Sequence, residues 1–404
     1  MYTIYAYDNG WKILHYPFMD DEGKIVINPI LNEALNTHGS LEFSIAPTNP
    51  FYDLLEPRNT KIKVVSDTKG RKPWFGRVME ITQGWDACLN VYCEGELGCL
   101  LDSHRAPYGF SGNIVETNSS APGYPGLLPI LINAYNGSNT RGYVFAVGNV
   151  SVTDPNGYIV RSSNMPQSIW EVMRNALFES SLGGYIMPRY DEETDTHYID
   201  YLALDDNDQY AHTSTQVIKF GQNLLDFKRY VKASDIMTVI VPYGAQFDES
   251  DTTHYEAGPP TNGTWNGNRL KMNTDRPGVS SYVENQTGID MWGRIVGFKI
   301  WDDVTIATNL ETKATAWLAQ QIWESVTLEI NAVDLSFVDA DIEQIQVGDY
   351  VRVQSKPHGI NVLLLCTSKT TYLTQLENSA IILGAGQKTI TNLQSQSLQK
   401  EDLN

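Results

Sequence analysis

Two histidines and a group of aspartates are the residues in this sequence best suited to acid–base or metal chemistry. His197 and His212 flank three acidic residues, Asp205, Asp206 and Asp208. Such a set could hold a divalent cation or supply a general acid and base. The spacing does not match the helical H-E-x-x-H pattern of zinc enzymes, and an EF-hand loop would need glycine where Tyr210 stands. A solvated acidic turn is therefore favoured over adventitious calcium binding or catalysis.

No recognisable catalytic motif accompanies these residues. The sequence has no G-x-S-x-G elbow, no phosphate-binding P-loop and no Cys-His signature. His254 and His358 stand in loop-like sequence without a nearby cysteine or serine in an activated arrangement. We therefore predict that the chain is not an enzyme, with no catalytic, cofactor-binding or metal-binding residues and no cofactor.

The four cysteines do not form paired C-x-x-C spacings. Structural zinc sites favour four ligands at short paired spacings, so a zinc site is the less favoured alternative. We predict buried free thiols at Cys88, Cys93, Cys99 and Cys366.

Nine tryptophans offer a second kind of candidate surface. A carbohydrate platform would use exposed aromatic rings. Trp170, Trp317 and Trp323 fall at apolar positions of helical patterns, so we interpret them as core or subunit contacts.

Length and composition indicate a multidomain protein. The 404 residues are enough for two to four domains, and 42% of them are hydrophobic. No segment approaches the roughly 18 apolar residues of a membrane span, and no signal peptide is visible at the N-terminus. We therefore expect the chain to work in the cytoplasm or in a particle assembled there.

The patterning predicts a β-rich α+β fold in several domains. Residues 1–103 contain short strands between tight turns, for example Ile62–Val65, Phe75–Ile81 and Leu89–Cys93. Residues 104–216 are mixed, and 217–245 with 327–386 return to strands. Residues 246–326 read as an inserted mixed domain with one helix, and 387–404 as a flexible tail or the start of an extension. We expect 1–103 and the second β block each to form a small β-barrel, and the two barrels to superpose.

Three helices are predicted from apolar spacing and capping residues. The first spans residues 124–135 and stops at Asn136-Gly137. The second begins at Ser168, where S-x-x-E forms a capping box with Glu171, and ends at Gly183-Gly184. The third begins at Thr308, with Glu311 in a second capping box.

Long motifs in a fixed order resemble the N-terminal region of tail proteins from long, non-contractile-tailed phages and prophages of Gram-positive bacteria. This family includes proteins called phage minor structural protein, prophage endopeptidase tail and tail-associated lysin. The resemblance covers residues 30–386. Its motifs are LEFSIAPTNPFYDLLEPRNTKIKVV (41–65), FGRV (75–78), CEGELGCLLDS (93–103), GNVSVTDPNGYIVRSS (148–163), SIWEVMRNALFESSLGGYIMPRY (168–190), KFGQNLLDFKRYVKASDIMTVIVPYGA (219–245) and NAVDLSFVDADIEQIQVGDYVRVQSKPHGI (331–360).

The resemblance implies a baseplate hub at the tail tip of a virion, assembled in the host cytoplasm. Members of this family resemble the baseplate hub of contractile-tailed phages. That hub is a homotrimer whose two barrels per subunit form a pseudo-sixfold ring around a channel for DNA. The implied partners are a distal tail protein or tail tube protein, a tape-measure protein, and a receptor-binding or lysin region downstream. Duplex DNA would only pass through, and no membrane is involved. The host, the receptor, the channel-lining residues and the subunit-interface residues do not follow from the sequence.

Two other functions remain as alternatives. One is a peptidoglycan-degrading tail-associated endopeptidase, which would need a catalytic centre. The other is a module that binds a cell-wall glycan or a receptor. Sedimentation or light scattering would separate a trimer from these, and cell-wall clearing would reveal the hydrolase.

The net charge of −19 supports the role in DNA passage. Clustered lysine and arginine side chains would trap phosphates through counterion release, whereas an acidic wall repels them. We expect the axial surface of the trimer to be net negative. Acidity spread evenly for solubility is the alternative.

Overall fold

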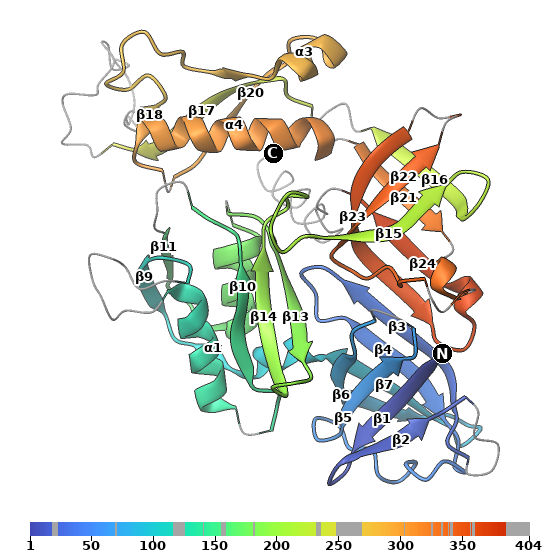
Figure 1. Cartoon of the computed structure of the whole chain (residues 1–404). Helices are drawn as coiled ribbons and strands as arrows, with labels where there is room; N and C mark the ends of the chain where they lie inside the picture. Colours follow the sequence, from blue (N-terminus) through green and yellow to red (C-terminus); the bar gives the residue numbers. More distant parts are fainter. Residues whose placement is uncertain are drawn as a thin grey trace.

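The computed structural model describes all residues except 18–22, 69–70, 116–125, 140, 155–158, 181, 232–235, 248–268, 303, 325, 333, 338, 340–341, 356, 358–359 and 385–404. Figure 1 shows a β-rich chain in which a few helices cover smaller sheets. The predicted β-rich α+β class is thus confirmed. The predicted tail at 387–404 and residues 248–268 of the predicted insertion lie outside the described residues.

One eleven-stranded sheet joins the two ends of the chain. Its strand order is β15-β22-β23-β3-β4-β7-β6-β5-β1-β2, and β24 pairs with β23. The strands are β1 Tyr2–Tyr7, β2 Trp11–His15, β3 Val26–Ala34, β4 Ser40–Ile45, β5 Lys61–Ser66, β6 Trp74–Gln83, β7 Leu89–Gly95, β15 His212–Lys219, β22 Asp349–Ser355, β23 Ile360–Tyr372 and β24 Ala380–Leu383.

The joint inside this sheet is the antiparallel pair β23–β3. Its register runs from Ser368 opposite Ala34 to Tyr372 opposite Ile30. In Figure 1 the blue N-terminal strands meet the red C-terminal strands along this pair. The order is open across the described residues, with β15 and β2 at its ends. The three strands predicted from turn-bounded apolar runs are confirmed as β5, β6 and β7.

Residues 104–204 form a mixed unit. A three-stranded sheet, β10-β14-β13, packs against helices, and two short pairs, β11-β9 and β12-β8, complete the unit. The elements are β8 His104–Arg105, β9 Tyr108–Gly112, α1 Leu127–Ser138, β10 Phe145–Val150, β11 Ile159–Ser163, β12 Gln167–Ser168, α2 Ile169–Met173, a π-helical turn Arg174–Phe178, β13 Tyr185–Asp191 and β14 Thr196–Leu202.

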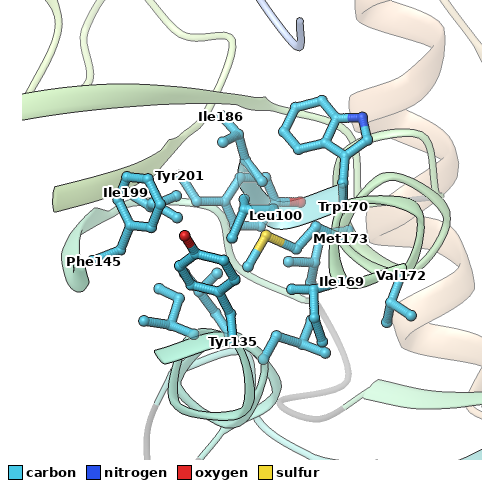
Figure 2. Packing of buried hydrophobic residues seen from close by; sticks show 14 of the residues in the cluster. Leu100, Tyr135, Phe145, Ile169, Trp170, Val172, Met173, Ile186, Ile199 and Tyr201 are labelled. Carbon is cyan, nitrogen blue, oxygen red and sulfur yellow. The ribbon is translucent and has the colours of Figure 1, made fainter. Parts of the chain in front are cut away.

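The core of this unit comes from both helices and the sheet. Figure 2 shows Tyr135 of α1 and Met173 of α2 directed toward Ile199 and Tyr201 of β14. The capping box predicted at α2 is confirmed, because Ser168 accepts from the Glu171 amide and the Glu171 carboxylate accepts from the Ser168 amide. The apolar side of this helix is also buried, and the helical backbone continues past α2 as a π-helical turn that ends at Phe178, before the predicted end at Gly183-Gly184.

The remaining elements form an inserted unit and a strand pair. In the inserted unit, helix α4 lies along a sheet of β17, β18, β19 and β20 (Figure 1). The elements are β16 Leu224–Val231, β17 Val239–Gln246, β18 Arg269–Lys271, β19 Val283–Glu284, α3 Gln286–Trp292, β20 Val296–Ile300, α4 Ala307–Glu324 and β21 Val326–Ala332, with β16 paired to β21. The third predicted helix is confirmed as α4, but it begins at Ala307, so Thr308 lies within its first turn and not at its N-cap as predicted.

Candidate functional site

His197 of β14 is half-buried where the mixed unit meets the first β unit, which is formed by strands β1 to β7. Its Nδ1 is 2.5 Å from Oε2 of Glu96, an ion-pair contact in which neither atom makes a hydrogen bond of normal geometry. The rings of Phe75, Tyr143 and Tyr190 surround it at centroid distances of 4.7, 4.8 and 4.8 Å. Burial raises the pKa of Glu96, and the His197 imidazole beside it opposes that rise. Aromatic rings surround the histidine, so the His197–Glu96 pair is placed to pack the two units against each other.

His212 belongs to a different place, at the start of β15. Its Nδ1 lies 3.0 Å from Oδ1 of Asp349 at the start of β22, and its Nε2 lies 3.4 Å from Oε1 of Glu343. Burial raises the pKa of Asp349, and hydrogen bonds from the Gln346 amide and from His212 oppose it. With carboxylates at both ring nitrogens, His212 links β15 to β22 and has no free nitrogen for a nucleophile.

The acidic residues between the two histidines form a turn that satisfies its own backbone. Oδ1 of Asp205 accepts from the Asn207 amide at 2.9 Å, and Oδ1 of Asp208 accepts from the Tyr210 amide at 2.8 Å. These local hydrogen bonds are typical of Asx turns. The favoured interpretation, an exposed acidic turn, agrees with this geometry.

The structure therefore does not bring the two histidines and the aspartates into one site. Each histidine has its own carboxylate partners. Within the described ranges, no hydroxyl or thiol group makes a hydrogen bond to either histidine. The same ranges contain no group of three His, Cys, Asp or Glu side chains that could hold a metal ion. His254 and His358 lie outside the described residues.

A buried ion pair that sequence reasoning missed lies at the β23–β3 joint, which is the seam of the large sheet. Nζ of Lys369 on β23 lies 3.0 Å from Oδ2 of Asp334, and their side chains are 0% and 1% exposed. Nζ also donates to the Ile345 carbonyl at 2.6 Å. The carboxylate further accepts from the Gln216 side chain at 2.6 Å and from the Ser336 amide at 3.1 Å. Both carboxylate oxygens of Asp334 therefore have hydrogen-bond or ion-pair partners.

Burial alone would raise the pKa of Asp334. The charge of Lys369, together with hydrogen bonds from Gln216, Ser336 and Lys369, more than compensates and holds that pKa below its usual value. Asp334 is therefore ionised at neutral pH, and the pair is a charged centre inside the protein. Its partners come from β15, from β23 and from the segment after β21, so the centre holds these elements together.

Two more polar contacts continue this seam into the N-terminal strands. Nε2 of Gln344 donates to the Tyr2 hydroxyl at 2.7 Å, and both side chains are buried. Arg71 pairs with Glu33, which stands opposite Lys369 in the β3–β23 ladder. Isolated charges in apolar strands, such as Lys369 in LLLCTSKTTYL, are the sequence signal that could have identified the seam.

A third histidine environment gives a pH-dependent prediction. The His38 ring, in the turn before β4, lies 4.4 Å from the Trp170 ring of α2, and its Nε2 is buried without a hydrogen-bond partner among the described residues. Burial, followed by the charges of Arg174 and Arg77, lowers the pKa of His38 to about 4. Unfolded chains protonate histidine near pH 6.5. Stability should therefore fall by up to about 3 kcal/mol as the pH drops from 6.5 to 4.

Urea unfolding at several pH values would measure this loss. His38→Phe should flatten the dependence between pH 6.5 and 4, and His104→Phe, at an exposed position, should leave it unchanged. An unchanged slope in His38→Phe would show that other groups cause the loss.

The cysteine and tryptophan predictions are confirmed in the main. Cys93, Cys99 and Cys366 are buried free thiols, whereas Cys88 is half-buried. Trp170 is buried in the mixed core, and Trp317 packs against the α4 core beside Trp301. The side chain of Trp323 lies outside the described residues.

Comparison with a known family covers the C-terminal part of the chain. Residues 212–394 match the family described as "Prophage endopeptidase tail". A search of curated proteins finds no match. None of the helices in the described ranges is long and apolar enough to cross a membrane.

Comparison with solved structures covers nearly the whole chain. It is similar to prophage tail protein gp18 from Listeria monocytogenes EGD-e, at 13% identity and a TM-score of 0.59 over 98% of each chain. It is also similar to a tail protein from Neisseria meningitidis MC58, at 12% identity and 0.56 over 96% of this chain and 97% of that one. The chain is also similar to the 43 kDa tail protein of prophage MuSo2 from Shewanella oneidensis. The identity is 13% and the TM-score 0.55, over 95% of this chain and 98% of that one.

These matches confirm the resemblance to phage and prophage tail proteins. The shared property of the three structures is their fold. The Gram-positive host and the non-contractile tail stay predictions.

Proposed function

We propose that this chain is a structural component of a phage tail tip, a trimeric hub between the tail tube or distal tail protein and the tip. The observation that carries the proposal is the tail-protein fold over 98% of the chain. The positions of the His197, His212 and Lys369 ion pairs support the proposal. The candidate residues with acid–base chemistry hold strands and units together instead of converging on a substrate-sized site.

The proposed division follows the sequence boundaries. Residues 1–103 and the segments 217–245 with 327–386 would be the two barrels, closed by contacts in the assembled ring. Residues 104–216 and 246–326 would form the parts below it, and 387–404 would lead to a tail or extension. A trimer would surround a channel with an acidic lining, through which DNA and the tape-measure protein pass. The net charge of −19 supports a lining that repels phosphates.

Light scattering on the purified chain at several concentrations tests the hub. We expect a mass that approaches three times 45.3 kDa as concentration rises. The same preparation should not bind duplex DNA at about 150 mM salt, where the Debye length is about 8 Å. A monomer at all concentrations, together with release of soluble muropeptides from purified cell wall, would favour the endopeptidase named in the family description.

A further inference from the structure

The turn between β6 and β7 presents a tryptophan entirely to solvent. Trp85 has a relative exposure of 106%, the highest among the exposed large apolar residues of the described chain. Single exposed apolar side chains are common on protein surfaces. A fully exposed indole is less expected, because tryptophan is highly buried on average. This position therefore needs a reason beyond the stability of the isolated chain.

The turn that carries Trp85 is fixed by hydrogen bonds. The Gly84 amide donates to the Cys88 carbonyl at 2.9 Å, and the Cys88 amide donates to Oδ1 of Asp86 at 3.1 Å. From another segment, the Tyr52 hydroxyl donates to the Ala87 carbonyl at 2.5 Å. The backbone that carries the indole is thus braced, which lowers the entropy that ordering the turn on binding would cost.

Backbone strain points the same way. Ala87 has a φ of 61°, in the left-handed region that residues other than glycine, asparagine and aspartate seldom adopt. Strain of this kind persists only where the surroundings enforce it, and it is concentrated at functional sites. Here the Tyr52 contact supplies the enforcement.

The segments that form and brace the turn carry exposed acidic and apolar side chains. Asp86 follows Trp85 in the turn, and Asp53 and Leu54 follow Tyr52; all three side chains are exposed, Leu54 by 51%. Tryptophan anchors fill apolar pockets at the centre of interfaces, and rim charges choose the partner. A complementary surface would be an apolar pocket with a basic rim. The same turn on a second copy carries the same exposed aspartates, so it does not supply such a rim.

We propose that Trp85 is the anchor through which this chain docks onto a different protein of the tail, in an apolar pocket rimmed by lysine or arginine. The proposal rests on the proposed function as a tail component. It names the residue of this chain that would make the contact and the chemistry of the surface that receives it.

Hydroxyl-radical footprinting with mass spectrometry tests the contact. We would compare the oxidation of Trp85 in the purified chain with that in the chain within assembled tails. We expect oxidation to fall about tenfold in tails, as for a residue at a desolvated interface centre. Equal oxidation in both would overturn the proposal. Protection in the purified chain that disappears on dilution would assign the contact to a second copy, and protection by purified cell wall would assign it to a glycan. Either result overturns it.

A competition between variants gives a second readout. Wild-type chain and Trp85→Ala would be produced in equal amounts during tail assembly, and their ratio in purified tails measured. We expect Trp85→Ala to be depleted about tenfold, with unchanged circular dichroism. Met165→Ala, at another exposed apolar position, should stay at equal abundance. Equal abundance of Trp85→Ala would contradict the anchor, whereas absence of every version from tails would remove the proposed function and the anchor with it.

Discussion

Lys369→Met should lower the free energy of unfolding by about 3–5 kcal/mol, because it leaves the Asp334 carboxylate buried without its countercharge. The side chain of Asp334 is 1% exposed, so water cannot replace the lost ammonium group. The hydrogen bonds from Gln216 and from the Ser336 amide would remain, but they do not neutralise the charge. Urea unfolding followed by tryptophan fluorescence at pH 7 measures the loss.

An exposed ion pair is the control for this variant. Lys12 and Asp8 form a salt bridge with side chains 53% and 40% exposed, so Lys12→Met should cost less than about 1 kcal/mol. The double variant Lys369→Met, Asp334→Leu should recover part of the loss, since it removes the unpaired charge. The stability that Asp334 contributes is present above the pKa of the unfolded chain, about 3.9. It should be lost as the pH falls through the lower pKa of the folded state. A loss below 1 kcal/mol in Lys369→Met would contradict a charged centre at the seam.

Gly95→Ala should also destabilise the protein severely, by about 3 kcal/mol or more. A Cβ at Gly95 would overlap the carbonyl oxygen of His38. Because the obstacle is backbone, a rotamer change cannot relieve it, and the turn before β4 must move. That turn also carries the His38 ring against Trp170, so the contact between the first β unit and the mixed unit should loosen. The expected signs are a lower midpoint of thermal unfolding and faster amide exchange in β4.

Gly137→Ala provides the matched control. Gly137 lies within α1, and a Cβ there meets nothing within 4 Å. Alanine is favoured over glycine in a helix by about 0.5–1 kcal/mol, so this variant should be slightly stabilised. If both variants changed stability equally, the overlap with His38 would not be the cause.

Local structure followed from the sequence because its determinants are close together in the chain. Ser168 and Glu171 are three residues apart, and their capping box forms as predicted. The strands β5, β6 and β7 also form where apolar runs bounded by turns predicted them. In each of these cases, hydrogen-bonding or apolar spacing within one element carries the information.

The seam and the anchor could not be predicted in the same way. Lys369 meets Asp334 across 35 positions, and Gln344 meets Tyr2 across 342. Such pairs depend on which strands become neighbours, and the alternation within a strand does not specify its neighbour. For His197 and His212 the opposite inference was wrong, because closeness in sequence did not bring them into one site. They are close in sequence, but each turns toward a carboxylate on a different element.

The pairing of β3 with β23 also has a consequence for synthesis on the ribosome. Residues 26–34 emerge early, but the strand that covers their edge spans residues 360–372. Until that strand is made, β3 exposes unpaired amide and carbonyl groups, which are a template for aggregation. Contacts of such long sequence separation also fold slowly. The first β unit should therefore reach its final state only after most of the chain has been translated, so nascent chains that end before residue 360 should depend on chaperones.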